Sequence, residues 1–439
     1  MRLSNILGLN ARTQLFSYRY NTVRGRKVCD SKIQTAKVLK VFEIAHPQIY
    51  KKFRRSEEIL SFDFQSLPNS FALKPSRGLG GEGIIVVKRR AKDGESWITT
   101  QRQRVTKDDL NLHILDILEG AYSLGNTPDV AFIQEFVGRH KAFRKYAYRG
   151  TPDIRIIVFN KVPVMSMLRL PTKDSGGRAN LHQGAIAVGI DITTGITTRA
   201  IWYETQIMLK PGSKRKLRGI KIPDWTKILQ MAVEASIASH MGYIGVDIVL
   251  HPQKGPMVLE LNAQPGLQIQ LANGAGLKKR LERVEDLDVR DAEHGVRIAK
   301  ALFAERFADR VKADEGIKTI KASEIVRVLG LDGQEVKTVA KIDTGAWSSS
   351  IDRKLAKDLG LLKKSRILWY KRKLSSLGHQ ERPVIPVTFW LAGRKIRTRM
   401  SVADRNKLTY KLLIGRIDLV GFLVNPEIEE EKLEGATKW

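Results

Sequence analysis

Apolar and polar residues alternate in two different ways along the first two thirds of this 439-residue chain. In residues 30–45 and 225–242, apolar positions recur three and four apart, which predicts helices with one buried face, the second ending at Gly242. Residues 154–170 and 244–262 carry dense apolar runs broken by turn residues, which predicts two β-hairpins. The alternation of helices and strands indicates an α+β or α/β domain.

The last third of the chain has a different pattern. A charged stretch with helical spacing is followed by short apolar runs with turn signals at Asp332-Gly333 and Ala392-Gly393, which predicts an all-β module. We therefore expect four parts: an N-terminal helical segment (residues 1–70), a mixed domain (71–285), a charged helical connector (286–322) and a β-module (323–439).

Charge adds a possible class of partner to this picture. The chain has 76 Lys and Arg against 46 Asp and Glu, a net charge of +30, and such a field concentrates polyanions. Nucleic acid, ribosomal RNA, nucleotides and acidic polypeptides are all candidates, and a solvated basic surface without a partner is the alternative. The basic residues are scattered and no nucleic-acid-binding motif surrounds them.

The single cysteine, Cys29, excludes an intrachain disulfide and a zinc site built from cysteines. No run reaches the roughly 18 apolar residues that a membrane span needs. The opening residues, MRLSNILGLNARTQ, have too short an apolar segment for a signal peptide. We expect a cytoplasmic protein without a membrane partner.

A glycine-rich loop follows the first predicted strand of the mixed domain. In KPSRGLGGEGIIVV, Lys74 precedes glycines at positions 78, 80, 81 and 83. Glycine lets backbone N–H groups approach phosphate oxygens, and the lysine adds a point charge. The spacing matches neither the P-loop nor the dinucleotide fingerprint, so the loop alone indicates an anion site and no more.

The second hairpin carries candidate metal ligands. Glu260 and Asn262 lie two apart in VLELN and therefore share one face of a strand, and Asp247 on the preceding strand is placed to oppose them. Magnesium prefers oxygen ligands from one or two carboxylates together with substrate phosphates. A solvent-facing polar stripe is the alternative.

These motifs, with PDIRIIVFNKVPVMSMLRLPTKDSGGRANLHQGA, YIGVDIVL and GPMVLELNAQPGL, resemble ATP-grasp carboxylate-amine ligases of the glutamate ligase (RimK-like) type. The beginning of the chain, ILGLNARTQLFSYRYN to DSKIQTAK, is similar to their alpha-L-glutamate ligase-like branch, and the resemblance covers about residues 5–285. It implies an ATP-grasp fold that uses ATP and magnesium, with manganese as the alternative ion.

The resemblance also implies roles for individual residues. Lys32 and Lys74 would contact the ATP phosphates under the loop formed by residues 78–83, in which Gly78, Gly80, Gly81 and Gly83 are the glycines. The resemblance places Gln134, Glu135 and Val137 at the adenine hinge, and Asp153 and Arg155 beside the nucleotide. It places Arg178 and Asn180 beside the phosphates, and Asp247, Glu260 and Asn262 around the metal ion.

The implied reaction transfers the γ-phosphate of ATP to a carboxylate, and an amine then attacks the acyl phosphate to form an amide. Catalysis of this kind rests on positioning and charge neutralisation. Arg155, Arg169 and Arg178 are our candidate catalytic residues, and a structural salt bridge is the alternative for Arg169. Only about 70 residues precede Lys74, fewer than the complete N-terminal domain of RimK-like enzymes, so the family does not settle the substrate.

The β-module contains Asp343-Thr344-Gly345 at the end of an apolar run. Together with YKLLIGRIDL and FLVNP, KIDTGAWSSSI resembles the retropepsin-like family labelled ATP-dependent zinc proteases, over about residues 323–426. The resemblance implies a small barrel in which Asp343 is one of two catalytic carboxylates, so a homodimer would complete the site. A turn aspartate with a binding role is the alternative. We do not expect zinc, because His379 is the segment's only histidine and it has no cysteine.

The leading hypothesis is an ATP- and magnesium-dependent ligase that adds an amino acid, glutamate being one candidate, to a carboxylate on an acidic peptide or protein. The retropepsin-like module would trim or bind the product. The alternatives are an ATP-regulated peptidase and a non-catalytic basic protein that binds the ribosome or RNA.

Overall fold

The computed structural model describes residues 5–78, 80–303, 318–375 and 378–426. The chain divides into two compact units, Met1–Val296 and Arg297–Trp439. Residues 304–317 of the expected connector lie outside the described residues; the part before them contains α10 (Ala292–Leu302), and the part after them contains β14 (Lys318–Lys321). Within the described ranges, no helix combines the length and the apolar character that crossing a membrane requires.

The first unit begins with short helices. They are α1 (Leu9–Ala11), the π-helix η2 (Arg12–Ser17), α2 (Tyr18–Tyr20), α3 (Val23–Cys29) and α4 (Lys32–Val41). The hydroxyl of Ser31 accepts a hydrogen bond from the Gln34 N–H, so Ser31 caps α4 and Lys32 becomes its first residue. Burial raises the pKa of Cys29 to about 12, which keeps this thiol protonated and unreactive.

A six-stranded sheet follows in the order β1-β6-β2-β3-β4-β5. Its strands are β1 (Ile49–Phe53), β2 (Phe71–Pro75), β3 (Ile85–Arg90), β4 (Trp97–Thr99), β5 (Arg104–Val105) and β6 (Ala131–Glu135). The helices α5 (Glu57–Leu60) and α6 (Lys107–Leu118) supply Ile59 and Ile114 to its apolar core. Thr106 forms a capping box with Asp109 at the start of α6.

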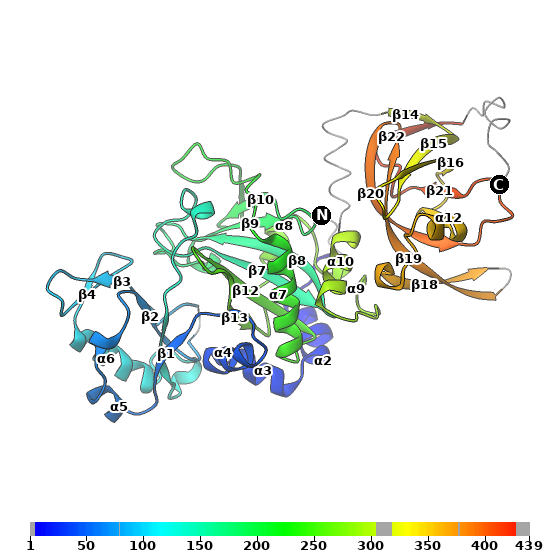
Figure 1. Cartoon of the computed structure of the whole chain (residues 1–439). Helices are drawn as coiled ribbons and strands as arrows, with labels where there is room; N and C mark the ends of the chain where they lie inside the picture. The colour runs from blue at the N-terminus through cyan, green and yellow to red at the C-terminus, as the bar shows by residue number, and fades with distance from the viewer. Residues whose placement is uncertain (1–4, 79, 304–317, 376–377, 427–439) are drawn as a thin grey trace. The chain divides into compact units, whose positions relative to one another are not determined.

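A second, antiparallel sheet has the order β11-β10-β9-β8-β7-β12-β13 (Figure 1). Its strands are β7 (Asp153–Phe159), β8 (Val162–Leu170), β9 (Ile186–Ile190), β10 (Thr197–Trp202), β11 (Thr205–Ile207), β12 (Tyr243–His251) and β13 (Gly255–Asn262). Both predicted hairpins are confirmed as β7–β8 and β12–β13. Asn160 and Lys161 have φ angles of 47° and 58°, the positive values that a two-residue type I′ turn requires.

Helices pack on this second sheet. They are α7 (Trp225–Ala238) on β7, β8, β12 and β13, and α8 (Ile269–Asn273) on β8 to β10, with α9 (Lys278–Glu282) following. The predicted end of α7 at Gly242 is wrong. The helix stops at Ala238 because His240 is left-handed, with a φ of 55°, and Met241 N–H donates back to the Ser236 carbonyl.

The second unit contains a closed β-barrel. Six strands follow one another around it, and the β15–β19 pairing closes the ring. Their order is β15 (Ser323–Leu329), β16 (Glu335–Asp343), β21 (Leu412–Gly415), β17 (Ser350–Asp352), β20 (Arg394–Ala403) and β19 (Gly378–Leu391). β18 (Trp369–Ser375) extends the sheet beyond β19, and β14 pairs with β22 (Phe422–Asn425). The barrel interior is apolar, with Val326, Phe389 and Ile414 fully buried.

The expectation of strands alone in this module is wrong, because the module also contains one short α-helix and one 3₁₀ turn. Residues Arg353–Asp358 form α12, whose N-terminus is capped by Asp352 through the Lys354 and Leu355 N–H groups. This single turn and a half is too short to show a helical apolar period in the sequence. The remaining short helices are the 3₁₀ turns η3 (Phe64–Ser66), η4 (Leu124–Asn126), η5 (Lys141–Phe143), η6 (Leu181–Gln183) and η7 (Lys364–Arg366).

Candidate active site

A cavity of about 650 Å³ in the first unit contains most of the predicted site residues. They come from α4, β2, the glycine-rich loop, the end of β6, both hairpins and the segment before η6. The predicted residues that line it are Lys32, Lys74, Gly78, Gly80, Gly81, Glu135, Val137, Asp153, Arg155, Arg169, Arg178, Asn180, Asp247, Glu260 and Asn262. The structure thus collects into one hollow residues that are up to 230 positions apart in the sequence, from 32 to 262.

Three predicted site residues do not line this cavity. Asp343 belongs to the other unit. A Cβ on Gly83 would stand 2.5 Å from the Tyr122 ring, so this glycine permits close packing on Tyr122. Gln134 is buried and uses its amide to bond Lys74 and the Pro47 carbonyl, which makes it a support for Lys74.

The two lysines occupy neighbouring positions in the cavity. Lys32 Nζ donates to the Gly78 carbonyl at 2.9 Å and lies 3.4 Å from Glu260 Oε1. Lys74 Nζ donates to Gln134 Oε1 at 2.9 Å. Burial, followed by repulsion from Lys32, lowers the pKa of Lys74 to about 8. An incoming phosphate would bring the opposite charge that favours the charged form of both lysines, so this pair is prepared for an anion.

The glycine-rich loop turns above these lysines. Gly80 and Gly81 have φ angles of 64° and 82°, a conformation that favours glycine. The side-chain amide of Asn180 donates to the Gly80 carbonyl at 2.9 Å and so ties the loop to the segment that carries Arg178. The Arg178 side chain is exposed, and its Nη1 donates a long hydrogen bond of 3.5 Å to Gln183 Oε1.

The centre of the sheet carries a cluster of two arginines and two aspartates. Arg155 Nε and Nη2 donate to the two oxygens of Asp247 at 2.7 and 2.6 Å. Arg169 Nε and Nη2 donate to those of Asp153 at 2.5 and 2.7 Å, and Arg169 Nη2 also reaches Asp247 Oδ2 at 2.7 Å. The strand register creates this cluster, because it pairs Asp153 with Arg169 and Asp247 with Arg155.

The pKa values of the two aspartates in this cluster are shifted in opposite directions. Burial raises the pKa of Asp153, with Asp247 adding to the effect, and attraction to Arg169 offsets only part of it. Burial also opposes ionisation of Asp247, but Arg155 and Arg169 together hold its pKa below the ordinary value. Asp247 is therefore the carboxylate that anchors both guanidinium groups.

Each of these arginines keeps one nitrogen free for a ligand. Nη1 of Arg155 and of Arg169 has no hydrogen-bond partner within the described part of the chain, and both side chains line the cavity. The salt bridge that we considered for Arg169 is present, and it fixes the orientation of a guanidinium that still faces the hollow.

The expected metal ligands are adjacent. Asp247 is paired with Glu260 across the hairpin, as the alternation implies, and Asn262 Nδ2 donates to Asp247 Oδ2 at 3.2 Å. Since the oxygens of Asp247 accept hydrogen bonds from arginines, the donors left for a cation are the Glu260 carboxylate and Asn262 Oδ1. One carboxylate and one amide oxygen fit magnesium that takes its other ligands from phosphates and water. The described residues contain no group of three or more His, Cys, Asp or Glu side chains arranged to hold a metal.

Several supporting residues escaped the sequence reasoning. Buried Arg12 donates to the Gln264 and Pro265 carbonyls, at 3.2 and 3.1 Å, and so fixes the loop after Asn262. Gln268 also lines the cavity and bonds His182 at 3.1 Å. No local pattern marks Arg12, because its partners lie some 250 positions away.

In the barrel, Asp343 ends β16 and is half-buried. Its Oδ1 accepts hydrogen bonds from the Gly345 and Ala346 N–H groups, both at 2.9 Å. The following loop is tied to the end of β21 by the Arg416 N–H, which donates to the Ala346 carbonyl at 2.8 Å. Nearby Trp347 is 61% exposed.

Comparison with solved structures gives distant matches. A protein of unknown function from Legionella pneumophila shares 21% identity at a TM-score of 0.18, covering 25% of this chain and 94% of that chain. The ATP-grasp ligase PsnB in complex with a minimal precursor shares 15% identity at a TM-score of 0.33, covering 61% of this chain and 62% of PsnB. An L-amino acid ligase from Bacillus licheniformis shares 12% identity at a TM-score of 0.34, covering 63% of this chain and 52% of that ligase.

The family comparison is more direct. No curated protein matches the chain. The family model described as sugar-transfer associated ATP-grasp matches residues 11–286, which confirms the predicted ATP-grasp domain without specifying the glutamate-ligase branch. Since this match spans more than half of the sequence, the chain belongs to the sugar-transfer associated ATP-grasp family.

Proposed function

We propose that the first unit is an ATP- and magnesium-dependent carboxylate-amine ligase. The observation that carries this proposal is the composition of the 650 Å³ cavity. Lys32, Lys74 and the glycine-rich loop supply an anion site at one part of it, and the arginine cluster supplies free N–H donors at another. Glu260 and Asn262 would hold magnesium, which neutralises phosphate charge when it is bound.

The chemistry follows from these positions. A substrate carboxylate oxygen attacks the γ-phosphorus of ATP, the bond to the β-phosphate oxygen breaks, and ADP leaves. The amine nitrogen then attacks the carbonyl carbon of the acyl phosphate, inorganic phosphate leaves, and the nitrogen loses a proton. Lys32, Lys74 and Arg178 neutralise the transferring group, while Nη1 of Arg155 and of Arg169 would hold the substrate carboxylate and then the acyl phosphate.

Both substrates belong to the proposal as well. The net charge of +30 favours an acidic peptide or protein as the carboxylate donor and an amino acid, with glutamate as the first choice, as the amine. The family name associates these proteins with sugar transfer, so uronic acids and amino sugars belong in the same screen.

The test measures ADP release by the full chain with magnesium and ATP over a matrix of carboxylates and amines, and identifies products by mass spectrometry. We expect ADP release that requires both a carboxylate and an amine, with a product heavier than the carboxylate by the amine minus water. ADP release that is indifferent to every such pair would overturn the ligase assignment. Steeply salt-dependent RNA binding without ATP turnover would instead favour the ribonucleoprotein-binding alternative.

A second candidate function concerns the barrel. We propose that it is a retropepsin-like half-site, supported by the half-buried Asp343, whose carboxylate is oriented by two backbone N–H groups at the end of a barrel strand. A second copy of the barrel would supply the second carboxylate, and the pair would share one proton and activate water. Asp343→Asn should abolish cleavage of a peptide library and leave ADP release unchanged; cleavage that persists in this variant would remove Asp343 from the mechanism.

A further inference from the structure

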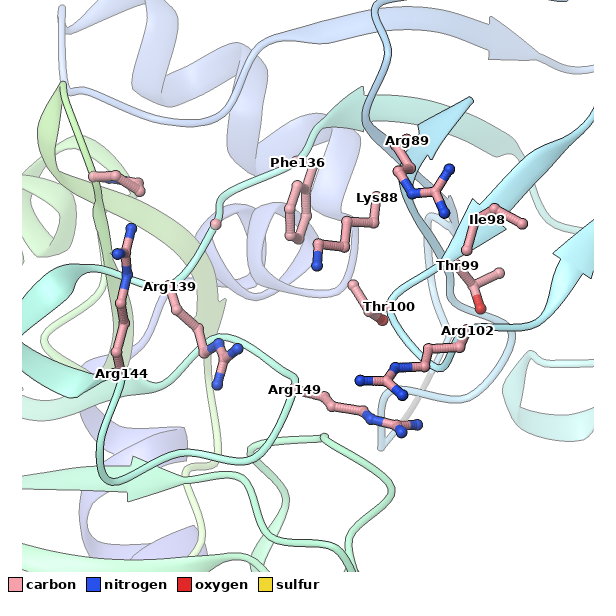
Figure 2. A pocket seen from close by; sticks show the side chains of 12 residues that line it. Lys88, Arg89, Ile98, Thr99, Thr100, Arg102, Phe136, Arg139, Arg144 and Arg149 are labelled. Atoms are coloured by element: carbon pink, nitrogen blue, oxygen red, sulfur yellow. The ribbon is translucent and has the colours of Figure 1, made fainter. Parts of the chain in front are cut away.

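The 650 Å³ cavity, in which we propose that ATP binds, is called the nucleotide cavity below. A second cavity, of about 660 Å³, adjoins it and shares Thr99, Thr100 and Phe136 with it. Its walls come from β3, from β4 with the turn after it, and from the segment that follows β6. Six basic side chains line it, namely Lys88, Arg89, Arg102, Arg139, Arg144 and Arg149. Figure 2 shows arginines on both sides of the hollow, with Arg139 and Arg144 on one side and Arg89 and Arg102 on the other.

Among the described residues, no acidic side chain lines this second cavity. The side chains of Lys88, Arg102 and Arg144 have no hydrogen bond or ion pair within the described part of the chain. The side-chain hydrogen bonds of the other three go to backbone carbonyls, and Arg149 also lies over the Tyr148 ring. These bonds run from Arg89 to Arg90, from Arg139 to Ala147 and from Arg149 to Gln101. On the neighbouring strand, by contrast, Arg104 has Asp93 as its partner.

The backbone also holds two of these arginines in an unusual conformation. Arg102 has a φ of 69° and Arg149 a φ of 47°, the left-handed region that non-glycine residues rarely adopt. Six like charges around one hollow repel each other, and none of them forms an ion pair within the described part of the chain. A bound anion would remove that repulsion.

We propose that this second cavity binds a small ligand with two or more adjacent phosphate groups. Guanidinium groups pair with phosphate through two parallel hydrogen bonds. A phosphate group carries about −1.5 to −2 at pH 7 and a carboxylate −1, so a short run of phosphates balances six cations in this volume better than an acidic peptide does. The volume is that of a small-molecule site, and Phe136 and Ile98 offer apolar contact to an organic body.

This proposal does not depend on the ligase reaction, because the six cations lie outside the nucleotide cavity. The experiment titrates tripolyphosphate calorimetrically into the full chain without added metal. The test variant is Arg102→Gln with Arg144→Gln, which removes from opposite walls two cations whose side chains have no hydrogen-bond partner in the described ranges. The matched control is Arg54→Gln with Arg55→Gln, two exposed arginines outside both cavities.

We expect the test variant to bind tripolyphosphate at least about tenfold more weakly, because each charge-assisted hydrogen bond is worth about a factor of ten or more. The control should stay within about twofold of the unmodified chain, and both variants should melt at the same temperature as that chain. An unchanged affinity in the test variant, or an equal loss in the control, would overturn the proposal.

Two further probes identify the source of the phosphates. Uridine diphosphate that binds more tightly than pyrophosphate, with the same sensitivity to the test variant, would indicate phosphates on an organic body; the reverse order would indicate inorganic polyphosphate. A hexaglutamate peptide that binds more tightly than tripolyphosphate would contradict the assignment to phosphate.

Discussion

The two cavities of the ATP-grasp unit have nearly equal volumes, about 650 and 660 Å³, and opposite ways of holding positive charge. In the nucleotide cavity, Arg155 and Arg169 are locked by buried aspartates and present single free nitrogens. In the second cavity, the cations have no carboxylate partner within the described residues. Locked cations suit the fixed geometry that a reaction needs, whereas unpaired cations suit the binding of a strongly charged ligand.

The largest expected effect is the loss of stability when a buried arginine of the nucleotide cavity is replaced. Arg169→Met leaves Asp153 buried without its partner, so we expect a loss of about 3–5 kcal/mol in the free energy of unfolding, measured by urea denaturation. The matched control is Arg19→Met, which removes an arginine that is 66% exposed and 3.7 Å from Glu285, and it should cost less than about 1 kcal/mol. Equal losses in the two variants would show that the buried cluster does not lock the fold.

The second effect concerns catalysis. Glu260→Gln removes the carboxylate that we assign to magnesium while keeping its shape, and we expect ADP release to fall about 100-fold or more. Glu282→Gln, in which the replaced side chain is 52% exposed, is the control and should retain the full rate. If both variants keep the full rate, Glu260 has no part in the reaction.

The third effect is the pH dependence of stability and of nucleotide affinity that Lys74 causes. Because its pKa in the folded protein is about 8 and its ordinary value is 10.5, the folded state binds fewer protons than the unfolded state between these pH values. Stability should therefore rise with pH in that window, while affinity for a non-hydrolysable ATP analogue falls above pH 8 as the lysine loses its charge. Lys74→Arg should abolish the fall in affinity; an identical pH profile in this variant would assign the effect to another group.

The smallest expected effect is the change in stability when two arginines of the second cavity are replaced. Arg102→Gln with Arg144→Gln should change the free energy of unfolding by no more than about 0.5 kcal/mol, because neither side chain has a partner within the described part of the chain. A loss above about 2 kcal/mol would mean that these arginines hold the fold together, and the contrast between the two cavities would disappear.

Sequence reasoning was most successful where the signal was local. The glycine-rich loop, the alternation of Glu260 and Asn262 and both hairpins depend on residues close together in the chain, and the structure has these elements as expected. It failed at the end of α7, where a left-handed His240 replaced the expected glycine, and at α12, which is too short for a periodic signal.

The sequence by itself determined the elements, the nucleotide-cavity residues that belong to motifs and the number of charges. Only the tertiary structure decided how those charges are distributed. The basic residues looked scattered along the chain, yet folding brings Lys88, Arg102 and Arg144 to one hollow and gives Arg155 and Arg169 to buried aspartates. Strand register and loop packing set these neighbours, and contacts between distant positions leave no period or spacing in a single sequence.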